Sequence, residues 1–498
     1  MKNREKIGVG LIILLTIILT FFFGVRKINY HCDEIWTYGL SNNQGDINPS
    51  FDTGVEYSGM GPFESFTEVL DGERFTYSNV WENQAKDVHP PFYYLLVHTV
   101  CSVFKGTFSK WYGISINLFW MIFIEILLYK LSKKITGNVV ASFGITLSYG
   151  ISVLFLDTLL LIRMYTQLTF FFIILAYVFK CYWNKELDRY FYIEISLISI
   201  FGMLTQYYFL MYIFAMCILF VIQLGRKKRW TELKKFIIDI ILSGFIYGCV
   251  WYHILAHIFN GYRGTEAISK AFSLGGLLSG FVGFLELIND ELFAGIMLLF
   301  VLIGAFFLFL KIKNKEIDLT FELSLFLAAV FYMLVVAKIA PMITHRYIMP
   351  IGWIIILESF LAVSGMLKML VPKQKNDLII SIIFVVISVV NIIIHEGYIT
   401  MDYYNSRFVN ALEETNGKEA VVFIDKSWKL LYDFVILQKA DKYILVDEDN
   451  IYEIMNAQTE DYLFIINLDE DTDQFVEQLD CELLYDDGTN FYYLVNVK

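Results

Sequence analysis

The sequence predicts a polytopic α-helical membrane protein with about 11 transmembrane helices, a long first extracytoplasmic loop and a C-terminal soluble α/β domain. Of 498 residues, 57% are hydrophobic and only 18% are charged, and mean hydropathy is +0.55, which is more apolar than a soluble domain. Residues 397–498 contain 22 Asp and Glu against 7 Lys and Arg, so this tail carries a net charge of −15 while the first 396 residues carry +3. The asymmetry indicates an acidic soluble domain on a membrane body and argues against nucleic acid as a partner.

Apolar runs of span length recur along the first 396 residues. The first, Ile7–Val25, suffices to cross a hydrocarbon core of about 30 Å. No small-residue cleavage site follows it, so we expect an uncleaved first span. Ten further spans are predicted at Trp111–Leu131, Val139–Leu156, Tyr165–Tyr182, Tyr190–Thr205, Tyr207–Leu224, Phe236–His257, Leu292–Leu310, Leu319–Ala337, Tyr347–Met366 and Leu378–His395.

The segment Phe92–Phe104 decides the topology. About 13 apolar residues are few for a span and suit a helix lying at the interface. If this segment does not cross, 21 of the 32 basic residues before Gly397 fall on the side of the N-terminus. The positive-inside rule then predicts a cytoplasmic N-terminus, with the first loop (26–110) and the tail outside. We therefore expect a transmembrane domain over residues 1–396, including that loop and its interfacial helices, and an acidic α/β domain over 397–498.

The tail alternates strand and helix patterns, as expected of a small α/β domain. Predicted strands are Ala420–Asp425, Tyr443–Val446 and Tyr462–Leu468, predicted helices are Ser427–Gln438 and Asp473–Leu479, and Glu482–Tyr485 with Phe491–Val497 forms a closing hairpin. Between the spans ending at His257 and beginning at Leu292, the glycines from Gly261 to Gly276 predict an outer loop.

Two acidic residues, Asp33 and Glu34, directly follow the first span within a cluster of aromatic residues. Desolvating a carboxylate at a membrane boundary is costly, which favours a functional use, although a solvated acidic helix cap is the alternative. The first loop ends in Asp87 and His89 followed by two prolines. The six cysteines have no metal-ligand spacing and are interpreted as apolar fillers.

Arginines at the outer ends of spans form a second group. Arg163 and Arg346 are each followed by a tyrosine, Tyr165 and Tyr347, and Arg263 is a weaker candidate of the same kind. Snorkelling beside an aromatic belt is the alternative interpretation. A carboxylate can act as a base toward a hydroxyl, and guanidinium groups bind phosphate bidentately. Together these residues suggest a group transfer in which a lipid phosphate leaves and a hydroxyl attacks.

At four places the chain resembles the GT-C superfamily of integral-membrane glycosyltransferases, in the branch of protein O-mannosyltransferases and aminoarabinose transferases. These are the acidic pair after the first span, the segment Asp87–Tyr94 with its His-Pro-Pro element, Arg163-Met164-Tyr165, and Arg346-Tyr347 with Pro350. Their order and spacing fit over roughly residues 1–370. Ile162 departs from the pattern, because many relatives carry a polar or small residue there.

The resemblance implies an inverting transfer of a sugar from a polyprenyl-phosphate donor to a hydroxyl of a cell-envelope glycan, lipid or protein. By family position, Asp33 is the catalytic base and Glu34 orients it or the acceptor. Arg163, Tyr165, Arg346 and Tyr347 are then expected to bind the donor phosphate, with Asp87, His89 and Arg263 as further residues of the active site.

Two other interpretations stay open. A flippase, polymerase or transporter of an envelope polysaccharide pathway would bury ionisable residues mid-span, where this chain has few. A scaffold that presents the acidic tail would leave the first-loop motif unexplained. We expect no essential cofactor, although Asp33, Glu34, Asp87 and His89 offer ligands for a divalent cation.

Overall fold

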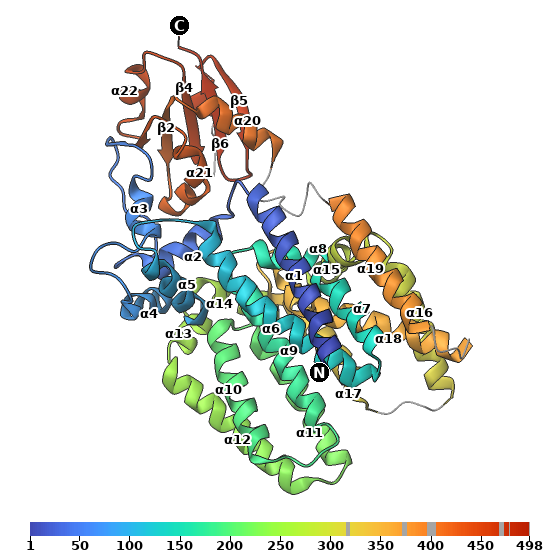
Figure 1. Cartoon of the computed structure of the whole chain (residues 1–498). Coiled ribbons are helices and arrows are strands. Elements are labelled where there is room, and N and C mark those ends of the chain that lie inside the picture. Colours follow the sequence, from blue (N-terminus) through green and yellow to red (C-terminus); the bar gives the residue numbers. More distant parts are fainter. Residues whose placement is uncertain (315–318, 371–375, 396–404, 468–472, 478, 498) are drawn as a thin grey trace. The chain divides into compact units, whose positions relative to one another are not determined.

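The apolar runs and the acidic tail form the expected helices and sheet in a computed structural model of the chain (Figure 1). The structure describes all residues except 315–318, 371–375, 396–404, 468–472, 478 and 498. The chain divides into two compact units. Unit 1 comprises Met1–Phe22, Asp87–Tyr93 and Ile114–Ile399, and unit 2 comprises Phe23–Lys86, Tyr94–Gly113 and Thr400–Lys498.

Most membrane helices belong to unit 1. They are α1 (Asn3–Arg26), α6 (Lys110–Thr136), α7 (Val139–Gly150), α8 (Val153–Leu160), α9 (Tyr165–Tyr182), α10 (Arg189–Thr205), α11 (Phe209–Arg226), α12 (Trp230–Val250), α13 (Ile254–Phe259), α14 (Tyr262–Phe272), α15 (Leu277–Phe293), α16 (Met297–Lys313), α17 (Phe321–Ile339), η1 (His345–Tyr347), η2 (Met349–Ile351), α18 (Gly352–Leu370) and α19 (Asn376–His395).

Among the described residues, seven helical segments are long and apolar enough to cross a membrane, and two bent pairs raise the number to nine. The pairs are α7 with α8, bent by 53°, and α14 with α15, bent by 112°. The polytopic prediction is confirmed, but nine is fewer than the expected 11 or so. Helices do lie at the three remaining predicted places, as α10, α12 and α16. The first and last of these have 17 residues, and the N-terminal turns of α12 are charged.

One predicted loop is helical. Residues between Gly261 and Gly276 form α14, and α15 then follows without a long connection. Only Ser273–Gly276 separates the two helices, and Gly276 adopts a left-handed φ of +79° that favours glycine at the turn. The glycines therefore mark a sharp bend rather than an extended loop.

The segment expected to lie at the interface is α5 (Phe92–Val103). Its 12 residues rise about 18 Å, well short of the roughly 30 Å of a hydrocarbon core. The other helices of the first loop are α2 (Cys32–Asn42), α3 (Pro62–Thr67) and α4 (Tyr77–Lys86). All three lie in unit 2, with the tail.

The tail forms a sheet of the expected α/β type. Its elements are α20 (Ser406–Thr415), β2 (Glu419–Ile424), η3 (Ser427–Tyr432), α21 (Phe434–Leu437), β3 (Lys442–Val446), α22 (Ile451–Asn456), β4 (Tyr462–Asn467), α23 (Asp473–Val476), β5 (Cys481–Asp486) and β6 (Phe491–Val495). With β1 (Glu56–Tyr57) included, the strand order is β1-β3-β2-β4-β6-β5. Strand β2 is parallel to both β3 and β4, and the other pairs are antiparallel. The predicted helix Ser427–Gln438 is instead two short helices, η3 and α21.

The first loop supplies a strand to this sheet. Strand β1 (Glu56–Tyr57) pairs antiparallel with β3, so that Tyr57 lies opposite Tyr443. A strand of two residues is too short to show an alternating pattern of apolar and polar residues. The sequence therefore does not predict β1.

Each face of the sheet has its own core. As in any β-strand, successive side chains of β2 point to opposite faces of the sheet, so β2 contributes to both cores. Val421 and Phe423 pack with Phe464 and Phe475 on one face. On the other face, residues of the tail share a core with residues of the first loop. The buried members of this core are Cys32, Ile35, Phe63, Phe66, Phe408, Ala411, Ala420, Val422, Ile424, Leu430, Leu431, Phe434, Ile436, Leu437, Ala440, Tyr443, Leu445, Leu463, Ile465 and Tyr492. We call this set the loop–tail core. It joins the loop and the tail into one folded unit (Figure 1).

Phe434 is a central residue of the loop–tail core. Its ring meets Tyr30, Phe63 and Phe108 edge-on or tilted, with centroids 5.8, 5.0 and 4.8 Å away. All three partners come from the first loop, so a single tail residue packs against three separate segments of the loop.

We predict that Phe434→Ala destabilises loop and tail together. Removing a buried ring costs about 3–5 kcal/mol, and limited proteolysis should then cleave the first loop as well as the tail. Phe475→Ala, on the other face of the sheet, is the matched control and should loosen only the tail. If Phe434→Ala left the loop as resistant as the control does, the shared core would not govern the loop.

Candidate active site

The acidic pair opens helix α2, whose first turn is fixed by a capping box. The Nδ1 atom of His31, at the N-cap, accepts from the Asp33 amide at 3.1 Å, and Oε2 of Glu34 accepts from the His31 amide at 2.9 Å. Two of the amides left unpaired at a helix start are thus satisfied reciprocally. Because Nδ1 is the acceptor, the proton of the neutral His31 ring lies on Nε2.

Glu34 is fully buried and ion-paired. Its Oε1 accepts from Nζ of Lys27 at 2.5 Å, and both side chains have 0% exposure. The Lys27 carbonyl in turn accepts from Nζ of Lys110. Both oxygens of Glu34 therefore contribute to holding the end of the helix, one through Lys27 and the other through the His31 backbone.

Asp33 is the more accessible of the two carboxylates. Its side chain is 20% exposed, against 0% for Glu34. One of its oxygens lies 3.7 Å from the His31 Nδ1 atom, which is already an acceptor for the backbone. The structure thus distinguishes two neighbouring acids that the sequence treats alike.

His31, Cys32 and Asp33 place one possible metal-ligand atom each within 4.8 Å of one another. Two features of the helix start weigh against a cation there. The Nδ1 lone pair of His31 is occupied by an amide, and a helix N-terminus carries partial positive charge. Three of the four ligands suggested by the sequence are engaged with other groups, since Glu34 pairs with Lys27 and Asp87 with His89.

In unit 1, Asp87, His89 and Arg163 form a hydrogen-bonded chain. Oδ2 of Asp87 lies 2.7 Å from Nδ1 of His89, and Nε2 of His89 lies 3.3 Å from Nη2 of Arg163. Burial raises the pKa of Asp87, but the neighbouring His89 and Arg163 outweigh it and lower the pKa below its ordinary 3.8. The Asp87 carboxylate therefore stays ionised at neutral pH. The stability that it contributes to the folded protein is lost only as pH falls through its lowered pKa.

Hydrogen bonds from a side chain of α6 fix the backbone just before Arg163. Helix α8 ends at Leu160, and the amide of Asn117 donates to the carbonyls of Leu159 and Leu161 at 3.0 and 2.8 Å. Tyr93, the second residue of α5, donates to the Asn117 side chain at 3.2 Å. The His-Pro-Pro segment and the arginine segment are thus tied at two points, through His89 and through Tyr93.

Arg346 and Tyr347 lie in η1 among aromatic rings of other helices. The Arg346 guanidinium lies over the ring of Tyr347 at 5.5 Å. Tyr165 and Tyr208 meet the same ring edge-on, with centroids 6.5 and 5.3 Å away. Arg346 is 9% exposed and Arg163 is 4% exposed, so each guanidinium is more buried than an arginine that snorkels to the surface.

Arg263 differs from the other two arginines. It lies on α14, is 44% exposed and pairs with Glu266 at 2.9 Å. Glu266, three residues later on α14, therefore partly neutralises Arg263.

Sequence reasoning did not single out Lys27, His31 or Tyr208. A capping-box signal is present, since His31 and Glu34 stand three residues apart with a histidine in the place of the usual serine or threonine. Tyr208 had no signal beyond its place at the start of the predicted span Tyr207–Leu224.

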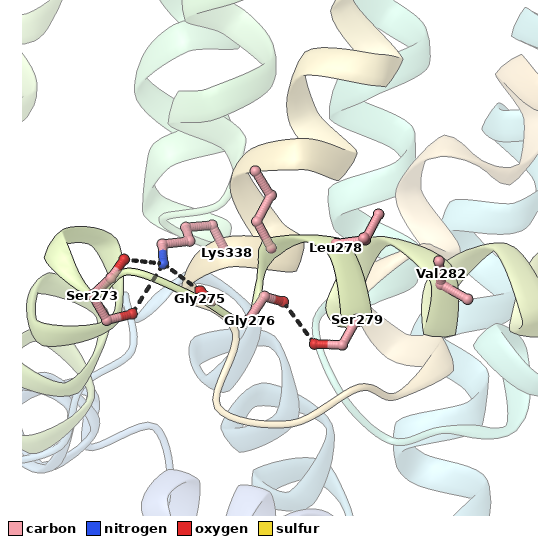
Figure 2. Close-up of a pocket in the computed structure, with 8 residues that line it drawn as sticks. Ser273, Gly275, Gly276, Leu278, Ser279, Val282 and Lys338 are labelled. Carbon is pink, nitrogen blue, oxygen red and sulfur yellow. Dashed lines mark hydrogen bonds between the residues drawn. The ribbon is translucent and has the colours of Figure 1, made fainter.

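A hollow of about 710 Å³ lies at the bend between α14 and α15 (Figure 2). Its lining is mostly apolar, with Leu277, Leu278 and Val282, and includes none of the predicted site residues. The Nζ atom of Lys338 donates to the carbonyls of Ser273 and Gly275 at 2.7 and 2.6 Å. Lys338 therefore holds the bend, as Figure 2 shows.

No protein-family model matches the chain, and no curated protein is significantly similar to it. Solved structures are similar in fold. The crystal structure of ArnT from Cupriavidus metallidurans bound to undecaprenyl phosphate is 10% identical, with a TM-score of 0.52 over 98% of each chain. ArnT in the apo state is 9% identical, with a TM-score of 0.51 over 93% of this chain and 96% of ArnT.

The archaeal oligosaccharyltransferase AglB from Archaeoglobus fulgidus, in complex with an inhibitory peptide and a dolichol-phosphate, is 11% identical. Its TM-score is 0.49, and the match covers 94% of this chain and 69% of AglB. At such identities the ArnT match concerns the fold alone. The chain has a GT-C-like polytopic membrane fold with a C-terminal α/β region.

Proposed function

We propose that this protein is a membrane glycosyltransferase that moves a sugar from a polyprenyl-phosphate donor to a hydroxyl of a cell-envelope glycan, lipid or protein, with inversion. The chain of Asp87, His89 and Arg163 carries the proposal, because it fixes a buried guanidinium of the kind that binds phosphate. The shared fold with ArnT, solved with undecaprenyl phosphate, supports a lipid-phosphate donor.

The reaction assigns one role to each charged group. Asp33 accepts the proton of the acceptor hydroxyl as its oxygen attacks the anomeric carbon of the sugar. The bond from that carbon to the phosphate oxygen breaks, and the lipid phosphate leaves with the electron pair. Negative charge grows on the leaving phosphate, so preorganised cations beside it lower the barrier.

Arg163 and Arg346 are the cations proposed for this role, with Tyr165 and Tyr347 beside them. Asp87 orients His89, whose second ring nitrogen faces Arg163, so His89 holds the guanidinium or donates to the phosphate. Arg263, paired with Glu266, is proposed to contribute less. Glu34 orients Asp33 by fixing the first turn of α2.

The proposed topology places the N-terminus in the cytoplasm and the first loop and tail outside. The distribution of basic residues supports it, as does the shortness of α5. A polyprenyl-phosphate headgroup and a water-borne acceptor can meet only at the membrane surface, which fits charged residues at the outer ends of the spans.

We predict opposite outcomes for the two neighbouring acids. Asp33→Asn should lower the turnover of sugar transfer by about 10²–10⁴-fold, as loss of a general base does, with normal thermal stability. Glu34→Gln should destabilise the protein, because breaking a buried ion pair costs about 3–5 kcal/mol. Transfer from lipid-linked sugars extracted from membranes and thermal unfolding in detergent measure the two effects. Near-normal turnover of Asp33→Asn would remove Asp33 from the mechanism.

We further predict that the arginines divide by burial. Arg163→Ala and Arg346→Ala should each lower turnover by about 10²–10³-fold, and the lysine variants should stay impaired because the bidentate fork is lost. Arg263→Ala, at an exposed and paired arginine, serves as the control and should be milder. Equal, mild effects of all three alanine variants would contradict a phosphate-binding role.

A further inference from the structure

Helix η3 of the tail packs against the start of α2. Leu430 and Leu431 of η3 lie in the loop–tail core with Cys32. Tyr432, the last residue of η3, packs against the loop–tail core, of which Cys32 is a member. Burial, Cys32 and the Asp33 charge all raise the pKa of Tyr432, so its hydroxyl stays protonated at neutral pH.

Two aromatic side chains of η3 remain partly exposed. Lys429 is buried and pairs with Asp425 at 2.9 Å, whereas Trp428 and Tyr432 are only half-buried. Their ring centroids are 6.2 Å apart at 61°. These two rings and the accessible Asp33 define what we call the aromatic edge.

We propose that the aromatic edge binds the acceptor and that the acceptor is a carbohydrate. A sugar has apolar ring faces that pack on aromatic side chains and hydroxyls that bond to carboxylates and phenols. The proposal rests on the proposed function, since it names the acceptor class of that reaction.

The surroundings disfavour other acceptors. Asp425 and Lys426, at the start of η3, are exposed and charged, which does not suit the apolar part of a lipid. The tail carries a net charge of −15, which disfavours a polyanionic acceptor. A neutral or amino-bearing glycan fits both conditions.

The test uses the full-length enzyme in lipid nanodiscs. The donor is the lipid-linked sugar fraction of membranes, and the acceptor probe is the water-soluble glycan released from envelopes of a strain lacking the gene. Trp428→Ala and Tyr432→Phe are compared with Tyr452→Ala, an aromatic residue 56% exposed on α22 whose ring meets Phe475 of the opposite face. Calorimetry measures glycan binding independently of turnover.

Trp428→Ala should raise the KM for the glycan roughly three- to tenfold, as loss of an aromatic contact does, with the KM for the donor unchanged. Tyr432→Phe keeps the ring and should have a smaller effect. If Trp428→Ala binds the glycan as Tyr452→Ala does, or if sugar passes only to peptide or lipid fractions, the proposal is overturned. If the wild type transfers no sugar but binds the glycan through Trp428, the edge stands and the proposed function falls.

Discussion

The loop–tail core is the interaction on which unit 2 depends. Helix α2 contributes Cys32 and Ile35 to it, and the tail contributes strands β2, β3 and β4. Each large side chain that it buries contributes about 1.5–3 kcal/mol. The direction in which Asp33 points is therefore set by residues about 400 positions later in the chain. The acidic domain therefore forms part of the structure that holds the proposed base.

Local patterns predict the regular parts of the fold, and tertiary contacts decide the exceptions. Tyr165–Tyr182 is predicted and observed to the residue because an apolar run of span length has few alternatives in a membrane. The segment 427–438 carries a helical pattern but is interrupted at Asp433. That buried carboxylate accepts hydrogen bonds from Asn490 and Tyr492, both at 2.8 Å, which no local pattern reveals.

The sequence predicts which types of residue form the candidate site, but it does not predict which role each of them has. The two adjacent acids look alike in the sequence, but in the fold Glu34 is buried against Lys27 while Asp33 stays 20% exposed. Asp87 and His89 stand two residues apart, so their contact is local. The bond from His89 to Arg163 spans 74 positions and needed the folded chain.

The strand pair β1–β3 joins Glu56 to Ile444, and this has a consequence for biosynthesis. The first loop leaves the ribosome long before its partner strands exist. At about 5–20 residues per second, the intervening segment takes on the order of 20–80 s to synthesise. Throughout that time Phe63 and Phe66 lack the tail residues that bury them in the finished protein. The loop therefore reaches its final packing only after the last fifth of the chain has been synthesised.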